Sequence, residues 1–170
     1  MHNILWEQAQ ILLERGGIVL ATILILSTLM WILIIERYLF FYRIHPRLLR
    51  QAVAEWRERT DHSSTTARRI RDGMISELST ASQRFLLPIE TITTVLPLLG
   101  LLGTVIGMIK TFDVMMVFGT GNGRGFAEGI SQALINSTAG LVAAIAGIYF
   151  AARLKRRVEK EQQLVTDRLI

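Results

Sequence analysis

Two long stretches of this sequence carry no Asp, Glu, Lys, Arg or His: TITTVLPLLGLLGTVIGMI at Thr91–Ile109 and GISQALINSTAGLVAAIAGIYFAA at Gly129–Ala152. A third such stretch, GGIVLATILILSTLMWILII, covers Gly16–Ile35. About 20 helical residues are needed to cross the hydrocarbon layer of a bilayer. The three stretches are 19, 24 and 20 residues long, so each can span a membrane. The sequence therefore predicts an all-α integral membrane protein with three transmembrane helices.

Small residues recur inside the second and third predicted spans. Gly103 and Gly107 form a GxxxG motif and so lie on one face of a helix. Small side chains at this spacing let helix backbones approach closely, and van der Waals contact then drives their association in lipid. We expect a helix-packing role, without chemistry, for Gly100, Gly103, Gly107, Gly140 and Ala144.

Polar side chains also occur inside these two spans. Thr104 lies in the second, and the third contains Gln132, Asn136, Ser137 and Thr138. Gln132 and Asn136 are four residues apart, which places them on one helix face. A mid-span amide needs a partner or a wet cavity, because the hydrocarbon layer offers it neither. For Thr104, Asn136 and Ser137 two roles remain open: lining a pore or cavity, and bonding one helix to another.

Several kinds of chemistry are absent from the sequence. No cysteine occurs, which excludes disulfides and cysteine-ligated metals, and the three histidines lack the spacing of metal ligands. We expect no enzyme and no cofactor, because no nucleophile–base pair or carboxylate cluster is placed toward a common pocket. None of the three spans contains an acid. A proton pathway through them would therefore use water and hydroxyl groups, or an acid that another polypeptide supplies.

Positive charge alternates along the chain between the apolar stretches. Lys and Arg number one in residues 1–15, ten in 36–90, two in 110–128 and six in 153–170. The positive-inside rule then predicts an N-out, C-in topology, with residues 36–90 and 153–170 in the cytoplasm. This topology accounts for the net charge of +5, so we expect no nucleic-acid partner. The first apolar stretch lacks a preceding positive segment, so we expect it to be a retained helix and not a cleaved signal peptide.

The segments around the first span have their own patterns. Residues 1–15 are predicted to form a periplasmic amphipathic helix that ends at Gly16-Gly17. The cytoplasmic residues 36–90 are predicted to be helical at 47–59 and to form a turn and a helix N-cap at 60–66. A second helix should start at Ala67 and continue through Pro88 and Pro97 into the second span.

Two further segments complete the chain. Residues 110–128 are predicted to form a periplasmic loop whose glycine-rich part, 119–125, is flexible. No strand precedes these glycines, which argues against a nucleotide site. Residues 153–170 are predicted to form a cytoplasmic helix that extends the third span, with Glu159, Lys160 and Glu161 on its solvent side. Its apolar stripe should contain Leu154, Val158, Gln162, Val165 and Leu169, and anionic lipid headgroups should meet Arg153, Lys155, Arg156 and Arg157.

In its second and third predicted spans the chain resembles the MotA/TolQ/ExbB proton-channel family, most closely its ExbB branch. The resemblance is carried by LPLLGLLGTVIGMI at residues 96–109, GISQALI at 129–135 and AGLVAAI at 139–145. It implies a homopentamer whose second and third spans line a central pore. It also implies an ExbD-like single-span partner that supplies a transmembrane Asp. Such a complex would sit in the inner membrane of a Gram-negative bacterium and spend the proton motive force on a TonB-like energy transducer for uptake of iron–siderophores or vitamins.

The resemblance also assigns roles to single residues. Thr104 matches the family's second-span threonine near the partner Asp, and Ser137 takes the place of the third-span threonine. Thr138 is then an additional hydroxyl. Gln132 falls where many members have Glu, and it cannot ionise. Together with Asn136, these residues form the predicted pore lining and proton pathway.

Two other readings remain beside the ExbB-like one. A TolQ-like subunit would drive envelope integrity and division with the same kind of motor, and sequence separates the two only weakly. A non-conducting membrane scaffold would have a dry interface. Apolar residues at 104 and 136 would favour the scaffold, but these positions hold Thr and Asn.

Overall fold

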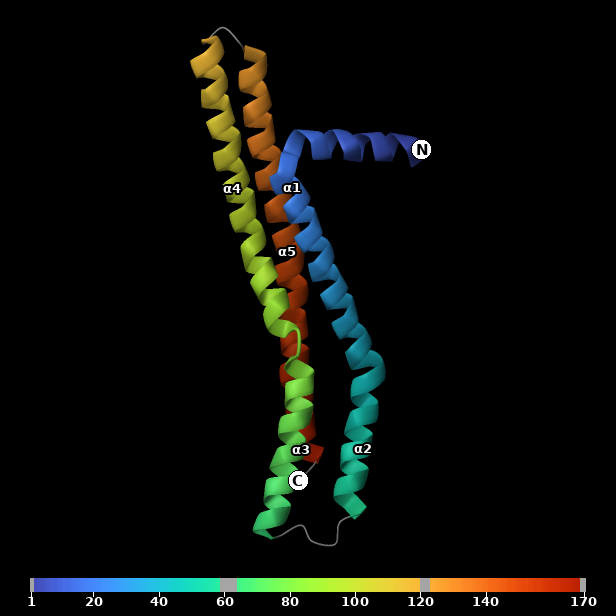
Figure 1. Ribbon diagram of the computed structural model, residues 1–170. Coiled ribbons are helices and arrows are strands. Elements are labelled where there is room, and N and C mark those ends of the chain that lie inside the picture. The colour runs from blue at the N-terminus through green and yellow to red at the C-terminus, as the bar shows by residue number, and fades with distance from the viewer. Residues whose placement is uncertain (1, 59–63, 120–122, 169–170) are drawn as a thin grey trace. The chain divides into compact units, whose positions relative to one another are not determined.

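The computed structural model describes residues 2–58, 64–119 and 123–168, and nearly all of them are helical (Figure 1). In chain order the elements are α1 (His2–Leu39), the π-helix η1 (Phe40–Ile44), α2 (His45–Glu58), α3 (Thr65–Gln83), α4 (Leu86–Phe118) and α5 (Gly123–Arg168). No strand occurs in the described residues. The prediction of an all-α chain is confirmed.

Three helical stretches, Leu13–Glu58, Thr65–Phe118 and Gly123–Val165, are long and apolar enough to cross a membrane. They contain the three predicted spans. Only 22% to 28% of the residues in their most apolar windows are buried within the chain. The other apolar side chains need a cover that this chain does not provide by itself, which lipid or further protein would supply.

The chain forms two compact units. The first combines residues 1–31 with residues 91–148, and the second combines residues 32–90 with residues 149–170. The first unit therefore holds most of the three predicted spans. The second holds the end of α1, η1, α2, α3, the first turn of α4 and the end of α5.

A bend at Gly17 divides α1 within the first unit. Gly17 has φ 66° and ψ −158°, a conformation that glycine adopts without steric cost. The predicted break at Gly16-Gly17 is confirmed, and Figure 1 shows the N-terminal piece turned away from the rest of the helix. This piece is helical from His2 onward. Its position at the membrane interface stays a prediction.

The second unit contains the start of α3 and a hydrophobic core. At the start of α3, Ser64 is the N-cap, and its hydroxyl accepts a hydrogen bond of 3.1 Å from the amide of Ala67. This cap falls inside the turn predicted for residues 60–66, of which 60–63 lie outside the described residues. The core side chains come from α2, α3 and α5, and they are Leu49, Trp56, Ala67, Leu78 and Val165.

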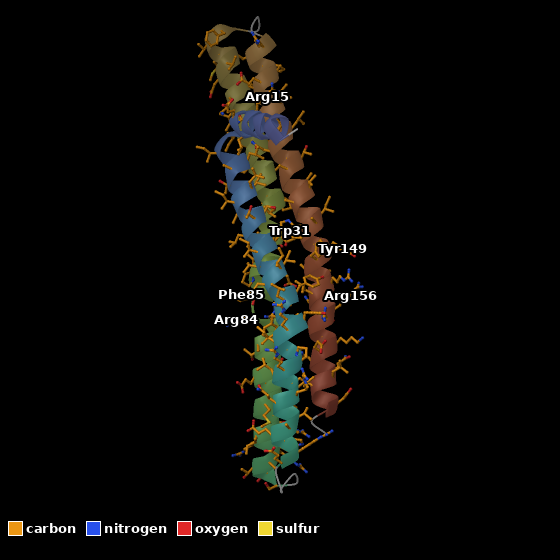
Figure 2. All side chains as sticks on the ribbon, turned by 90° about the vertical axis from the view of Figure 1, so that its right-hand side faces the viewer. Arg15, Trp31, Arg84, Phe85, Tyr149 and Arg156 are labelled. Carbon is orange, nitrogen blue, oxygen red and sulfur yellow. The ribbon has the colours of Figure 1, made fainter. Side chains whose placement is uncertain are left out.

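The helix predicted to continue from Ala67 into the second span is interrupted at Arg84 and Phe85 (Figure 2). Phe85 has φ 65°, in the left-handed region that is strained for a bulky side chain. The expectation of continuity is therefore wrong at this point. It is right at Pro97, which lies inside α4. Pro88 is the third residue of α4, where its missing N–H would have no acceptor in the helix.

A contact far away in sequence marks this interruption. The buried guanidinium of Arg37 donates hydrogen bonds to the carbonyls of Ala81 and Ser82, in the last turn of α3. These carbonyls have no N–H partner further along α3, because the helix ends at Gln83. The end of α3 is thus satisfied by a side chain of α1.

Two smaller predictions are also wrong. Of the loop predicted for residues 110–128, residues 110–118 belong to α4 and residues 123–128 belong to α5, and residues 120–122 lie outside the described part of the chain. Glu161 was expected on the solvent side of α5 with Glu159 and Lys160. It is only partly exposed, because its carboxylate faces His45.

Candidate functional site

Helices α4 and α5 of the first unit meet along faces made of small residues. A Cβ added at Gly107 would lie 2.7 Å from the Cβ of Ala133, and one added at Gly140 would lie 2.7 Å from a carbonyl oxygen of α4. Both distances are shorter than real Cβ contacts, so the backbones approach closely only because these positions are glycine. Gly100 and Gly103 also face α5, and Ala144 is 2% exposed.

Asn136 lies inside this close contact. It is fully buried, and a Cβ at Gly103 would overlap its side chain. The Asn136 side chain, its Cβ first, therefore occupies the space that the glycine leaves. Neither the oxygen nor the nitrogen of this amide has a hydrogen-bond partner among the described residues. Such a group is costly in an apolar surrounding unless it meets water or another polar group.

Gln132, one turn before Asn136, connects three helical segments. Its side-chain oxygen accepts a hydrogen bond of 2.8 Å from the ammonium group of Lys110 on α4. Its side-chain nitrogen donates one of 3.2 Å to the carbonyl of Gly16 on α1. That carbonyl lies at the bend of α1, so the amide of Gln132 holds the start of the first span against α4 and α5.

The three hydroxyl residues are more accessible than the two amides. Thr104 and Ser137 are half-buried and Thr138 is exposed. Thr104 donates to the carbonyl of Leu101 at 2.6 Å, and Thr138 donates to that of Leu134 at 2.7 Å. The hydroxyl protons of these two threonines are thus used within their own helices, while each oxygen keeps a lone pair that can accept a hydrogen bond.

The structure thus separates the five predicted pathway residues into two sets. Gln132 and Asn136 lie in the interior of the unit, which favours a role between helices for both amides. Thr104, Ser137 and Thr138 lie at accessible or partly accessible positions, where a second protein chain can reach them. Around them the accessible surface is apolar, with Leu101, Leu102, Val105, Leu141 and Val142 exposed.

A cavity of about 300 Å³ lies at the end of this unit where α4 and α5 are connected. Gln132 contributes to its wall, and the other polar residues there are Lys110, Asp113 and Glu128. Sequence reasoning did not select these three charged residues. The sequence contains a pattern that could have found them. Lys110 and Asp113 are about one helical turn apart at the end of the second span, and Glu128 lies about one turn before Gln132 at the start of the third.

The four basic residues that directly follow the third span, Arg153, Lys155, Arg156 and Arg157, are exposed. Lys155 lies 3.4 Å from the carboxylate of Glu90, and the guanidinium of Arg157 lies 5.6 Å from the centre of the Phe41 ring. Arg156 points away from α5 (Figure 2). Arg153 is exposed beside them. Contact of these four residues with lipid headgroups stays a prediction.

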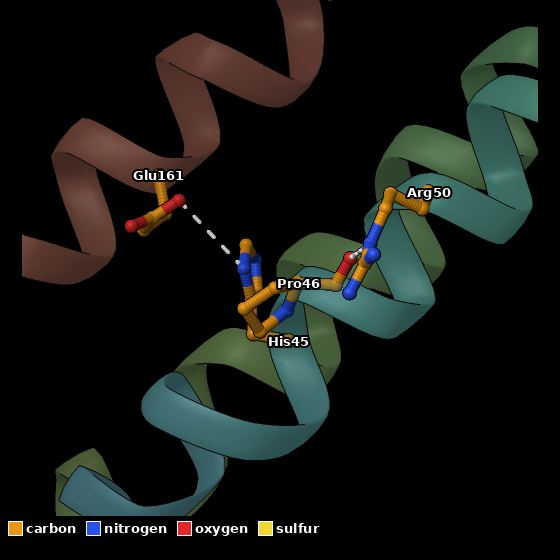
Figure 3. A network of polar contacts seen from close by, with 4 residues as sticks. All are labelled: His45, Pro46, Arg50 and Glu161. Atoms are coloured by element: carbon orange, nitrogen blue, oxygen red, sulfur yellow. Dashed lines mark hydrogen bonds and ion pairs between the residues drawn. The ribbon is translucent and has the colours of Figure 1, made fainter.

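Sequence reasoning missed a second polar cluster, which lies in the second unit. His45, at the start of α2, is 2% exposed, and its Nδ1 lies 3.6 Å from the carboxylate of Glu161 on α5 (Figure 3). Burial is the main cause that lowers the pKa of His45 from its usual 6.5. Within the described residues, no group of three or more His, Cys, Asp or Glu side chains could hold a metal ion.

Two proteins of Synechocystis sp. are similar to part of this chain. A biopolymer transport protein from Synechocystis sp. with the provisional name ExbB-like 3 is 46% identical over 71 residues, which are 41% of this chain and 34% of that protein. A second Synechocystis protein, provisionally named ExbB-like 1, is 47% identical over 60 residues, which are 34% of this chain and 24% of that protein. The matches span only about a third and a quarter of these relatives.

A family model matches a much larger share of the chain. It is the model of the MotA/TolQ/ExbB proton channel family, and it covers residues 42–167. The matched range contains the second and third predicted spans with all five predicted pathway residues. Since the match covers well over half of the 170 residues, this chain belongs to the MotA/TolQ/ExbB proton channel family.

Proposed function

We propose that this chain is the channel-forming subunit of an ExbB-like complex, in which several copies surround a single-span partner that carries a transmembrane Asp. The complex uses the proton motive force to do mechanical work on a TonB-like transducer. The observation that supports this best is the set of accessible hydroxyls, Thr104, Ser137 and Thr138, in spans that contain no acid. No enzymatic step and no cofactor is part of the proposal.

The exposed apolar surface supports the presence of several copies. Fewer than a third of the residues in each apolar window are buried within one chain. Lipid can cover the face of α1, but a hydroxyl in contact with lipid tails gains nothing from its remaining lone pair. A neighbouring subunit and a partner helix around the α4–α5 face would use both the apolar side chains and the hydroxyls. The resemblance suggests five copies.

The hydroxyls suit a carboxyl group that changes its protonation state. A protonated Asp has an O–H that can donate to the oxygen of Thr104, whose own proton is held by Leu101. An ionised Asp has no proton to donate, so the threonine must rotate and give up its bond to Leu101. The resting arrangement of Thr104 therefore favours the neutral acid, which can pass an apolar wall at lower cost than the charged one.

The energy for work comes from the membrane potential. One elementary charge that crosses 100 mV releases about 2.3 kcal/mol, so several protons are needed for each substantial movement. Protons would enter from the side of Lys110, Asp113 and Glu128, which the distribution of positive charge assigns to the periplasm. They would leave on the side of residues 153–170. An inner membrane of a Gram-negative bacterium is the proposed location.

The test is proton flux into vesicles that contain the chain together with its single-span partner, measured with a pH-sensitive dye under an imposed potential. Replacing Thr104, Ser137 and Thr138 together by Ala should reduce the flux about tenfold, the equivalent of one lost hydrogen bond of about 1.4 kcal/mol. The matched control is Thr22→Ala with Thr28→Ala, because these α1 threonines bond to their own helix in the same way. The control should conduct like the unchanged protein.

Two results would count against the proposal. One is a triple variant that assembles normally and conducts at the original rate. The other is equal loss of flux in the control, which would mean that any span hydroxyl matters. Growth on siderophore-bound iron, compared with tolerance of detergents, separates a TonB-like from a Tol-like task.

A further inference from the structure

The surroundings of His45 differ from those of a histidine at a protein surface. Its imidazole is packed against two aromatic rings of η1, with ring centres 6.3 Å from Phe40 and 5.6 Å from Phe41. Its Nδ1 lies 3.6 Å from the Glu161 carboxylate, which is beyond hydrogen-bond distance. Its Nε2 is buried and has no partner among the described residues. Figure 3 shows the ring directed from α2 toward α5.

Positive charge surrounds the same two rings. The guanidinium of Arg37, on α1, lies 4.3 Å from the ring centre of Phe40 and 5.2 Å from that of Phe41. The guanidinium of Arg157, on α5, lies 5.6 Å from the centre of Phe41. Among the residues that the structure describes, the charged groups that act on His45 are one carboxylate, Glu161, and the two guanidiniums of Arg37 and Arg157.

A proton added to His45 would have no good place in this packing. Protonation converts Nε2 into a donor, and no acceptor faces it among the described residues. The new charge is repelled by Arg37 and Arg157. Glu161 attracts it, but this carboxylate is partly exposed, with 23% of its side chain accessible, so water screens the attraction.

We propose that the contact of His45 with Glu161 and the η1 rings is a pH-sensitive connection between α2 and α5, closed while the imidazole is neutral and opened by its protonation. The π-helical turn Phe40–Ile44 is the element that yields. Single π-turns inside α-helices are rare and are frequent at functional sites. This turn joins α1 directly to the residue that takes the proton.

The direction of the pH effect follows from linkage. Burial, with further repulsion by the two arginines, lowers the pKa of His45 below 6.5 in spite of Glu161. Above pH 6.5 the imidazole is neutral in both the closed and the open form, so the contact keeps its full stability. Below pH 6.5 the open form binds the proton more tightly than the closed form. Stability is then lost as the pH falls toward the lowered pKa, with at most about a tenfold rise in opening for each pH unit.

Only the biological consequence rests on the proposed function. If residues 36–90 face the cytoplasm, His45 senses the pH of the compartment into which the channel releases protons. Opening of the contact upon acidification would then couple the packing of α2 against α5 to the number of protons delivered. The opening itself is a property of the second unit and requires neither partner nor conduction.

Hydrogen exchange of the purified full chain in detergent, between pH 7.5 and 5.5 and corrected for intrinsic rates, tests the inference. Protection in residues 41–49 and 157–165 should be constant above pH 6.5 and fall below it. His45→Gln, which cannot take a proton, should remove this fall, and His62→Gln should leave it intact. Glu161→Gln should make the fall larger at the acid end, because the carboxylate that attracts the added proton is gone.

The contrary results are equally definite. An unchanged fall in His45→Gln would overturn the proposal, and so would stronger protection at pH 5.5 than at 7.5, which would mean that Glu161 closes the contact. If His45→Gln does not fold, the imidazole signals of the unchanged protein in NMR decide, because a His45 titration at or above 6.5 contradicts the mechanism. His45 is outside the proposed pathway, so His45→Gln should conduct normally at pH 7.5. A failed flux experiment would leave the exchange result standing.

Discussion

Single residues of the α4–α5 contact have roles that depend on shape as much as on polarity. Gly103 has no side chain where Asn136 needs space. Gly103→Ala should therefore force the two helices apart and lower the free energy of unfolding by about 1–3 kcal/mol. Thermal unfolding in detergent measures this. Gly73→Ala is the control, since a Cβ there meets nothing within 4 Å and helix propensity favours Ala by about 1 kcal/mol.

The double variant separates the clash from a general effect of alanine. Adding Asn136→Ala to Gly103→Ala removes the unpaired amide, whose carbon and nitrogen would lie 2.9 Å from the added Cβ, but it keeps the Asn136 Cβ, which would lie at 2.3 Å. It should therefore recover only part of the lost stability. If the double variant is less stable than Gly103→Ala, the Asn136 amide has a partner that contributes more than its burial costs, and a buried water between α4 and α5 would be the first candidate.

Gln132 acts through both ends of its amide. Gln132→Leu keeps the size but leaves the ammonium of Lys110 and the carbonyl of Gly16 without this partner, which should cost about 1–3 kcal/mol. Gln132→Glu keeps an acceptor for Lys110 but cannot donate to Gly16. Its loss should therefore be smaller than that of the Leu variant. Equal losses in the two variants would argue that only the bond to Gly16 matters, and thermal unfolding compares them directly.

At the scale of elements, the joint between α3 and α4 depends on Arg37. Arg37→Met retains much of the packing on Phe40 and removes the hydrogen bonds to the last turn of α3. We expect a loss of about 2–3 kcal/mol and faster cleavage by trypsin after Arg84. Arg50→Met is the matched control, because Arg50 is exposed and bonds within its own helix. If trypsin cuts both variants at the same rate, Arg37 does not hold the joint.

The same elements explain what the sequence could predict and what it could not. The spans, the bend at Gly16-Gly17 and the Ser64 cap depend on neighbours within one or two turns, and local pattern reveals such features. The break at Phe85 is not marked by glycine or proline at that position. The carbonyls of Ala81 and Ser82 just before the break accept hydrogen bonds from Arg37, which lies 44 and 45 residues earlier in the sequence. Glu161 likewise differs from Glu159 only in facing His45, a contact that periodicity alone does not specify.

The candidate site was predicted in composition but not in arrangement. The residues Thr104, Gln132, Asn136, Ser137 and Thr138 stand out because polar groups are rare in apolar helices. Which of them face the interior depends on the rotation of α4 against α5, and the glycines set that rotation through contacts between segments about 30 residues apart. The two amides and the three hydroxyls therefore separate only in three dimensions.

For the whole molecule, the decisive quantity is the number of chains in the complex. The exposed apolar residues of α4 include Leu101, Leu102 and Val105, and one chain buries less than a third of each apolar window, so neighbouring chains or lipid must cover the rest. We expect the detergent-purified protein to be a ring of five chains of 19.2 kDa each, about 96 kDa of protein. Light scattering corrected for bound detergent, or native mass spectrometry, gives this mass.

Variants at the accessible face make the same prediction more specific. Leu101→Arg places a charge on the face of α4 that we assign to the assembly, and it should break the ring into smaller species while each chain stays helical. Ile25→Arg places the same charge on an exposed position of α1, which we assign to lipid. A charge near the bilayer centre is costly at either site, but only the α4 variant should change the protein mass. A monomeric unchanged protein, or an intact ring with Leu101→Arg, would remove the basis for a pore between copies of this chain.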